Sequence, residues 1–119
     1  MTIGVSNQVM LARVPVEAGP WYAQANEMMN NGNYDPAIQL YDKVIGTSPA
    51  CAMAHHNKGN CLDQLGKLTD AVRCYDTAIG IDPYDAESWY NKSTTLLKLG
   101  KTNDASRCAE RAIDLSMGR

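Results

Sequence analysis

The sequence lacks phenylalanine, long apolar runs and any large excess of one charge. Its 119 residues hold 11 Lys and Arg against 13 Asp and Glu, which gives a net charge of -2. So balanced a charge does not favour nucleic-acid binding, and no stretch approaches the roughly 20 apolar residues of a membrane-spanning helix. Arg13, the only cation in residues 1–17, follows the apolar stretch 9–12, whereas a secretory signal carries its cations first. We therefore expect a cytoplasmic protein that binds neither nucleic acid nor membrane.

Motifs for catalysis or metal binding are also missing. The four cysteines, Cys51, Cys61, Cys74 and Cys108, form no C-x-x-C pair, so we expect reduced, buried thiols and no disulfides. The order Cys51, His55, Cys61 departs from the spacing of zinc fingers, and no cysteine has a well-placed histidine base. A glycine-rich loop for phosphate groups is absent as well. The sequence predicts no cofactor, no metal and no enzymatic activity.

An internal repeat of 34 residues is the most informative feature that is present. Residues 52–85 and 86–119 are identical at 13 positions when they are aligned without gaps, whereas unrelated segments share about two. Residues 18–51 match 52–85 at nine positions. The chain therefore divides into an N-terminal arm, residues 1–17, and three units, residues 18–51, 52–85 and 86–119.

Each unit has the pattern of two α-helices joined by a short turn, because its apolar and small residues recur at intervals of three and four. Gly32, Gly66 and Gly100 are expected to end the first helix in the left-handed conformation that costs glycine little. The second helix is expected to start at a polar cap and to stop before a proline. The expected caps are Asp35, Thr69 and Asn103, and the prolines are Pro49 and Pro83.

These residues make the sequence similar to the tetratricopeptide repeat family over residues 18–119. The family pattern runs from a tryptophan to an alanine, an aromatic residue and a proline. Its matches are Trp21, Ala37, Tyr41 and Pro49 in the first unit, His55, Ala71, Tyr75 and Pro83 in the second, and Trp89, Ala105 and Ala109 in the third. The resemblance implies an all-α superhelix, a solenoid of three helix-turn-helix repeats, with His55 in the packing position of the tryptophan.

The resemblance also implies that the first helices line a concave groove. A polar stripe on these helices is separate from the packing stripe, and its asparagine amides can both donate and accept hydrogen bonds to a peptide backbone. Tyr22, His56 and Tyr90 are the expected anchors of a bound segment. The candidate peptide-binding residues are Tyr22, Asn26, His56, Asn57, Asn60, Tyr90 and Asn91. The sequence thus predicts an adaptor that binds a protein or peptide partner.

Some arrays of this family grip the acidic carboxyl terminus of heat-shock chaperones, and the resemblance permits a test of that function. The family pattern has asparagines at Asn26 and Asn57, which are present here. It has basic residues at three further positions, where this sequence has Tyr22, Glu87 and Asn91, so all three cations are missing. Each charge-assisted bond to a carboxylate contributes about 1.5 to 3 kcal/mol, so we expect no binding of chaperone tails.

A scaffold subunit that assembles through its outer or terminal helices is the alternative function. The third unit has Ser106 and Ala109 where the others have larger apolar residues, and we expect it to cap the array of a complete small protein. The remaining apolar face of residues 105–115 predicts a possible homodimer through the terminal repeat. In the arm, residues 9–11 could form one amphipathic turn, or the arm could be disordered. A further hypothesis is that the arm lies on the first unit or in the groove of a neighbour.

Overall fold

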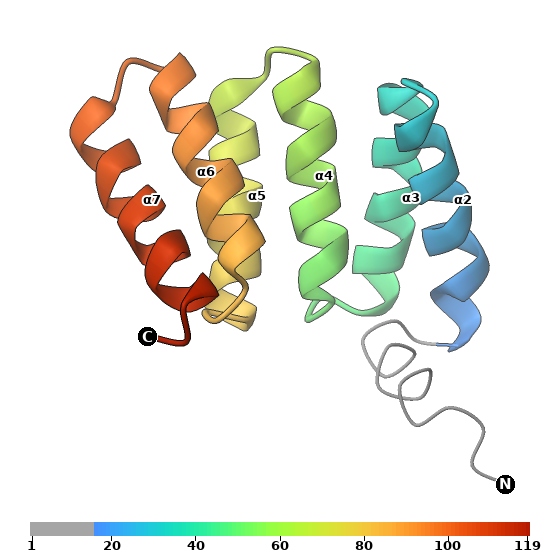
Figure 1. The fold of residues 1–119 in the computed structure, drawn as a ribbon. Helices are drawn as coiled ribbons and strands as arrows, with labels where there is room; N and C mark the ends of the chain where they lie inside the picture. Colours follow the sequence, from blue (N-terminus) through green and yellow to red (C-terminus); the bar gives the residue numbers. More distant parts are fainter. Residues whose placement is uncertain (1–15) are drawn as a thin grey trace, which may run out of the picture.

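Six α-helices follow one another in antiparallel pairs in the computed structural model, which describes residues 16–119 (Figure 1). A short 3-10 helix, η1 (Val16–Ala18), leads into the first pair. The helices are α2 (Gly19–Asn30), α3 (Tyr34–Thr47), α4 (Ala52–Gln64), α5 (Leu68–Ile81), α6 (Ala86–Lys98) and α7 (Thr102–Ser116). This arrangement confirms the predicted all-α superhelix, and six helices fit three repeats. The predicted turn at residues 9–11 lies outside the described residues.

The turn inside each pair depends on a glycine in the left-handed conformation, as the sequence predicts. The φ angles are +82° at Gly32, +79° at Gly66 and +78° at Gly100. The N–H of Gly66 donates to the carbonyl of Asp63 at 2.9 Å, and the N–H of Lys67 donates to the carbonyl of Leu62 at 2.9 Å. This pair of bonds is the Schellman motif, which satisfies carbonyls at the end of the helix. The other two turns contain the same bonds.

The second helices begin two residues earlier than the sequence predicts, which corrects the expected caps at Asp35, Thr69 and Asn103. The residue after each glycine is the actual cap, and it makes no side-chain capping bond. Lys67 illustrates the reason, because its N–H closes α4 while its carbonyl accepts from the N–H of Ala71 at 3.0 Å. One residue thus ends one helix and starts the next, so no separate capping side chain is required.

The core consists mainly of alanine, and its largest fully buried side chains are two tyrosines. α3 buries Ala37, Tyr41 and Val44, and α5 buries Ala71, Tyr75 and Ala78. α7 buries Ala105, Cys108 and Ala112, which are smaller. Small side chains let neighbouring helices approach closely, and the tyrosine rings fill the space between successive repeats. Because a buried tyrosine hydroxyl needs a partner, this core has to include polar side chains.

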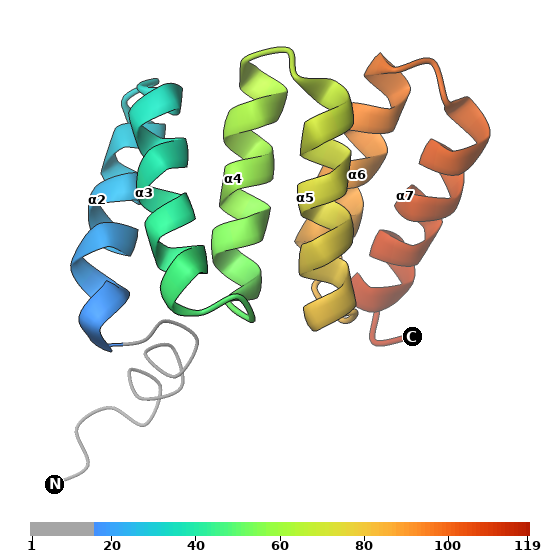
Figure 2. The same ribbon diagram turned by 180° about the vertical axis from the view of Figure 1, so that it is seen from behind.

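Successive repeats join through the second helix of one and the first helix of the next. α3 packs on α4 and α5 packs on α6, while direct contacts between the first helices are few. Figure 1 and Figure 2 show α2 at one end of the array and α7 at the other, with α4 and α5 in the middle. In the described part of the chain, no helix is long and apolar enough to cross a membrane.

Candidate functional site

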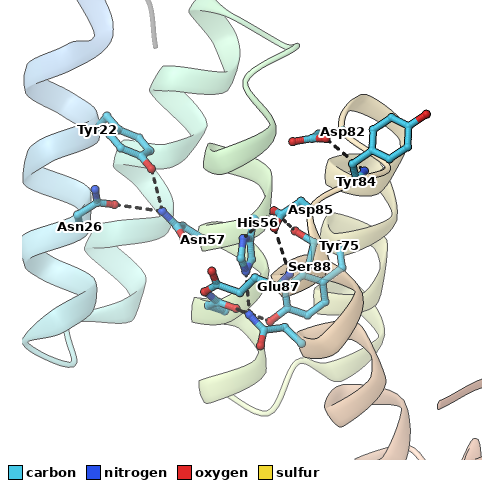
Figure 3. Close-up of polar contacts among 12 residues, drawn as sticks. Tyr22, Asn26, His56, Asn57, Tyr75, Asp82, Tyr84, Asp85, Glu87 and Ser88 are labelled. Atoms are coloured by element: carbon cyan, nitrogen blue, oxygen red, sulfur yellow. Dashed lines mark hydrogen bonds and ion pairs between the residues drawn. The ribbon is translucent and has the colours of Figure 1, made fainter. Parts of the chain in front are cut away.

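The candidate asparagines lie where the repeats meet. In the joint between the first two repeats, Asn57 on α4 donates from Nδ2 to the hydroxyl of Tyr22 and to Oδ1 of Asn26, both at 3.2 Å (Figure 3). Oδ1 of Asn26 also accepts from the hydroxyl of Tyr41 at 2.5 Å. The rings of Tyr22 and Tyr41 meet edge to face with centroids 6.1 Å apart. Four side chains from three helices therefore form one hydrogen-bonded cluster.

The same cluster recurs 34 residues later in the joint between the second and third repeats. Nδ2 of Asn91 on α6 lies 2.8 Å from Nε2 of His56 and 3.1 Å from Oδ1 of Asn60. The hydroxyl of Tyr75 donates to Oδ1 of Asn60 at 2.6 Å. The His56 and Tyr75 rings meet edge to face with centroids 5.8 Å apart. Burial raises the pKa of both core tyrosine hydroxyls, Tyr41 and Tyr75, which therefore stay neutral and donate.

These bonds leave one half of each amide without a partner. Asn60 accepts twice through its oxygen, and Asn91 donates both of its amide hydrogens. Within residues 16–119, Nδ2 of Asn60 and Oδ1 of Asn91 have no hydrogen-bond partner, and no buried side-chain nitrogen or oxygen in that range lacks one. The two groups are therefore open to solvent. One repeat earlier, within the same described range, Nδ2 of Asn26 and Oδ1 of Asn57 likewise have no hydrogen-bond partner.

His56, one of the expected anchors, is buried in the joint. Its residue is only 4% exposed, because α6 covers it and Tyr75 packs against its ring. Since Asn91 donates to Nε2, the imidazole is neutral and carries its proton on Nδ1, which lies 3.7 Å from the Asp85 carboxylate. Burial lowers the pKa of His56 even though Asp85 and Glu87 act to raise it. Figure 3 shows the ring between Asn57 and Asp85.

The two tyrosine anchors lie in different surroundings. Tyr22 is half-buried in the first joint. Tyr90, its counterpart in the third repeat, is 58% exposed, because no described residue packs on the outer side of that repeat. The sequence repeat places the three anchors at equivalent positions, but the end of the array leaves only Tyr90 widely exposed.

His55 takes the place of the tryptophan, as the sequence predicts, though it is half-buried rather than in the core. Its Nε2 lies 2.8 Å from the carbonyl of Pro49. In the next repeat, Nε1 of Trp89 donates to the carbonyl of Pro83 at 2.9 Å. Both side chains thus hold the loop that ends the preceding helix. Because consecutive residues of a helix point about 100° apart, His55 and His56 serve different contacts.

A concave pocket of about 410 Å³ lies beside the second joint. Its lining residues are Met29, Tyr34, Asn60, Asp63, Gln64, Tyr75, Asn91, Thr94 and Lys98. Asp63, whose side chain is 8% exposed, pairs with Nζ of Lys98 at 2.5 Å and accepts from the hydroxyl of Thr95. The pocket is therefore polar, and its one buried carboxylate is neutralised by a neighbouring cation.

The sequence pattern predicted that the first helices line this pocket and missed the two residues that the second helices contribute. Of the candidate residues, the structure brings only Asn60 and Asn91 into its lining. Tyr34 and Tyr75 come from the second helices, whose sequence pattern predicts packing alone. The equivalent tyrosines Tyr41 and Tyr75 were a usable signal, since a tyrosine at a core position needs a polar partner nearby.

The cysteines are all free and differ little in their surroundings. Cys51, Cys61 and Cys108 are buried, and Cys74 is half-buried. Burial raises the pKa of Cys61 to about 11, and it also raises the pKa of Cys74 and Cys108. The thiols of Cys61, Cys74 and Cys108 are therefore protonated and poorly nucleophilic near neutral pH.

Comparisons with known proteins agree with this fold. Two family models, both described as tetratricopeptide repeat, match residues 22–86 and 74–105. A search of curated protein sequences finds no match. Among solved structures, the chain is similar to the crystal structure of MamA, with a TM-score of 0.81 and 18% identity. That alignment covers 85% of this chain and 59% of MamA, so the chain spans less than two thirds of that protein.

Two further solved structures cover more of their own length. The second TPR of Spaghetti (RPAP3), bound to the HSP90 peptide SRMEEVD, has a TM-score of 0.81 and 22% identity over 91% of this chain and 98% of that one. The Sgt2 TPR domain from Aspergillus fumigatus has a TM-score of 0.82 and 20% identity over 87% and 70%. At these identities the likeness is one of fold. A family model that matches more than half of the residues, three helix pairs and their glycine turns together establish that the chain belongs to the tetratricopeptide repeat family.

Proposed function

We propose that this chain is a non-enzymatic, cytoplasmic adaptor that binds an extended or helical peptide segment in its concave pocket. The observation that carries the proposal is the pair of unsatisfied amide groups at that pocket, Nδ2 of Asn60 and Oδ1 of Asn91. One is a donor and the other an acceptor, which is the pair that a peptide unit requires. Free, separated cysteines are consistent with a reducing compartment.

Fixed orientation gives these amides their value for binding. Asn60 is held by Tyr75 and Asn91, and Asn91 is held by His56, so neither amide has to be ordered when a ligand arrives. Ordering a free side chain on binding costs about 0.5 to 1.5 kcal/mol, which these positions avoid. The solved structure of the related Spaghetti (RPAP3) TPR with a bound HSP90 peptide supports peptide capture as a use of this fold.

The joint asparagines are poor positions for testing the proposal by substitution. Alanine at Asn57 and Asn60 removes bonds inside the joints, so lost binding would not be separable from lost stability. Gln64 is a better position, because it lines the pocket from an exposed place at the end of α4 and has no hydrogen bond within the described residues. Gln64→Trp fills the pocket, and Gln39→Trp, on the exposed side of α3, is the matched control.

The experiment selects ligands from a random-peptide phage library on the full chain and measures them by fluorescence polarisation. We expect the selected peptides to bind Gln64→Trp at least about tenfold more weakly, a loss of about 1.4 kcal/mol, and to bind Gln39→Trp as they bind the wild type. Thermal unfolding of both variants checks that they fold. Peptides that bind Gln64→Trp as well as the wild type, or a selection that yields no peptide, would reject the proposal.

A further inference from the structure

The outer side of the third repeat carries an uncovered surface, which we call the terminal face: Ala86, Tyr90, Glu110, Ile113 and Met117. Tyr90, Ile113 and Met117 are 58%, 55% and 65% exposed. A hollow of about 450 Å³ lies here between α6 and α7, and its lining shares no residue with the concave pocket. The terminal face is therefore a separate surface.

The equivalent faces of the first two repeats are covered in one repeated way. α4 covers the first, where Asn57 donates to Tyr22 and Lys58 pairs with Asp42 at 2.7 Å. α6 covers the second, where Asn91 donates to His56 and Lys92 pairs with Asp76 at 2.5 Å. Each joint thus uses an Asn-Lys dipeptide on the incoming helix. The receiving repeat supplies a ring acceptor and a carboxylate.

The terminal face keeps the receiving half of this arrangement. Tyr90 follows His56 by 34 residues, Glu110 follows Asp76, and Ile113 follows Ile79. Within residues 16–119, the Tyr90 hydroxyl and the Glu110 carboxylate have no hydrogen-bond or ion-pair partner. A ring acceptor and a carboxylate are therefore in the positions that the two inner joints use, and Ile113 adds an exposed apolar side chain beside them.

The incoming helices also share small side chains on either side of the dipeptide. Ala54 and Ser88, three residues before each asparagine, are fully buried. Cys61 and Thr95, four residues after it, are fully buried as well. Positions three and four apart lie on one helix face, so these residues let the backbone of the incoming helix approach the receiving repeat.

We propose that the terminal face is the docking site for an α-helix of a partner protein with the pattern small-x-x-Asn-Lys-x-x-small, where the last small residue can be Cys or Thr. Its asparagine donates to the Tyr90 hydroxyl and its lysine pairs with Glu110. The apolar contact is with Ile113. The exposed Glu110 carboxylate favours a helix that carries a cation. The two inner joints, which α4 and α6 cover, supply the side-chain pattern of such a helix.

A second copy of the chain fits the face less well. Its free first helix, α2, has Ala23 and Gln24 at the positions of the dipeptide and Glu27 at the position of Cys61. Stacking α2 on the terminal face would bury the Glu27 carboxylate and would leave Glu110 without a cation. In addition, Ala105 and Ala112 of the predicted homodimer face are buried against the chain's own helices. The chemistry favours another chain over a twin.

The first test titrates the ¹⁵N-labelled full chain with a synthetic peptide of residues 84–99, which carries the pattern around Asn91 and Lys92. We expect chemical-shift changes confined to Tyr90, Glu110, Ile113 and their neighbours. A peptide with Asn91→Ala and Lys92→Glu should bind at least about tenfold more weakly. Shift changes at the concave pocket in place of the terminal face would overturn the proposal.

A charge exchange makes the test specific. Glu110→Lys in the chain should abolish binding of the original peptide and restore binding of the peptide with Lys92→Glu. Glu110 is exposed and outside the core, so this variant folds as the wild type does. Equal binding of the original peptide to Glu110→Lys and the wild type would contradict the assigned contact.

A single short helix is marginally stable in water, and this lowers the affinity of a free peptide. Tethering the helix to the chain removes that limit. The same segment, residues 84–99, is appended after Met117, where the tether gives an effective concentration in the millimolar range. We expect the melting temperature to rise by several degrees and the rise to be lost when the appended copy carries Asn91→Ala and Lys92→Glu. An unchanged melting temperature would reject the site. Light scattering that shows a wild-type dimer, broken by Glu110→Lys, would replace the partner helix with a second copy.

Discussion

Asn91 and His56, one repeat apart, are joined by a bond of 2.8 Å between Nδ2 and Nε2. The bond requires a neutral imidazole, because a protonated ring offers only donors. Around the ring lie Tyr75 from α5, the carboxylate of Asp85, which caps α6, and the carboxylate of Glu87 on α6. Burial still lowers the pKa of His56. The joint between the second and third repeats therefore contains a group whose pKa is lower in the folded chain than its ordinary value of about 6.5.

The stability of the fold should therefore decrease in mild acid. Because the folded pKa is the lower one, the unfolded state takes up the proton first. The contribution of the neutral ring is fully present above about pH 6.5 and is lost as the pH falls below it, with a slope of at most about 1.4 kcal/mol per unit. Urea unfolding at a series of pH values from about 7.5 to 5.5 measures this slope.

His56→Tyr provides the matched variant, since tyrosine occupies this position in the first and third repeats, and the Tyr22 hydroxyl accepts the equivalent bond. We expect it to fold and to show a smaller loss of stability over the same pH range. If wild type and variant lose stability in parallel, another group is responsible for the pH dependence.

Asn91→Ala should destabilise the chain by about 1 to 3 kcal/mol, because it removes two hydrogen bonds and leaves Nε2 of the buried His56 without a partner. Asn57→Ala should act in the same direction in the first joint. Urea unfolding gives both values. Asn30→Ala is the control, since Asn30 is exposed on α2 and makes no side-chain bond within the described residues. A loss at Asn91 no larger than at Asn30 would mean that the cluster contributes nothing to the joint.

The fold could be predicted from the sequence because its determinants are local and recur. Each glycine turn depends on a few adjacent residues. The 34-residue period repeats the same helix pair three times, and such pairs are stable only when they stack on one another. The helix starts were misplaced for a local reason as well. Asp35 is a good cap by residue type, but Asn33 is the cap of α3, because its N–H closes the Schellman turn after α2 while its carbonyl accepts from the N–H of Ala37.

The role of the asparagines could not be predicted from one helix at a time. On α4 alone, Asn57 and Asn60 belong to a polar stripe of the kind that solvent or a ligand covers. The tyrosines that use them, Tyr41 and Tyr75, arrive from other helices with hydroxyls that must be satisfied. The burial of His56 likewise depends on α6, so it becomes visible only when the repeats are stacked.

Gly66→Ala should destabilise the chain by about 1 to 2 kcal/mol, because its φ of +79° is a conformation that L-residues adopt at a cost. No atom blocks a Cβ there, so the cost comes from the backbone alone. Gly80→Ala is the control, since Gly80 lies in α5 with open space around it and should gain about 0.5 to 1 kcal/mol. Thermal unfolding measures both. A gain in both variants would show that the turn tolerates a side chain.

The peptide SRMEEVD should not bind this chain, although the Spaghetti (RPAP3) TPR domains bind it in their solved structures. Tyr22, Glu87 and Asn91 stand where the family pattern of chaperone-tail binding has cations. Lys98, the cation of the concave pocket, is already paired with Asp63. Three missing charge-assisted bonds, at about 1.5 to 3 kcal/mol each, remove most of the binding free energy of such a peptide. Calorimetry with a Spaghetti domain as the positive control should detect binding to that domain and none here, and a micromolar dissociation constant for this chain would contradict the electrostatic argument.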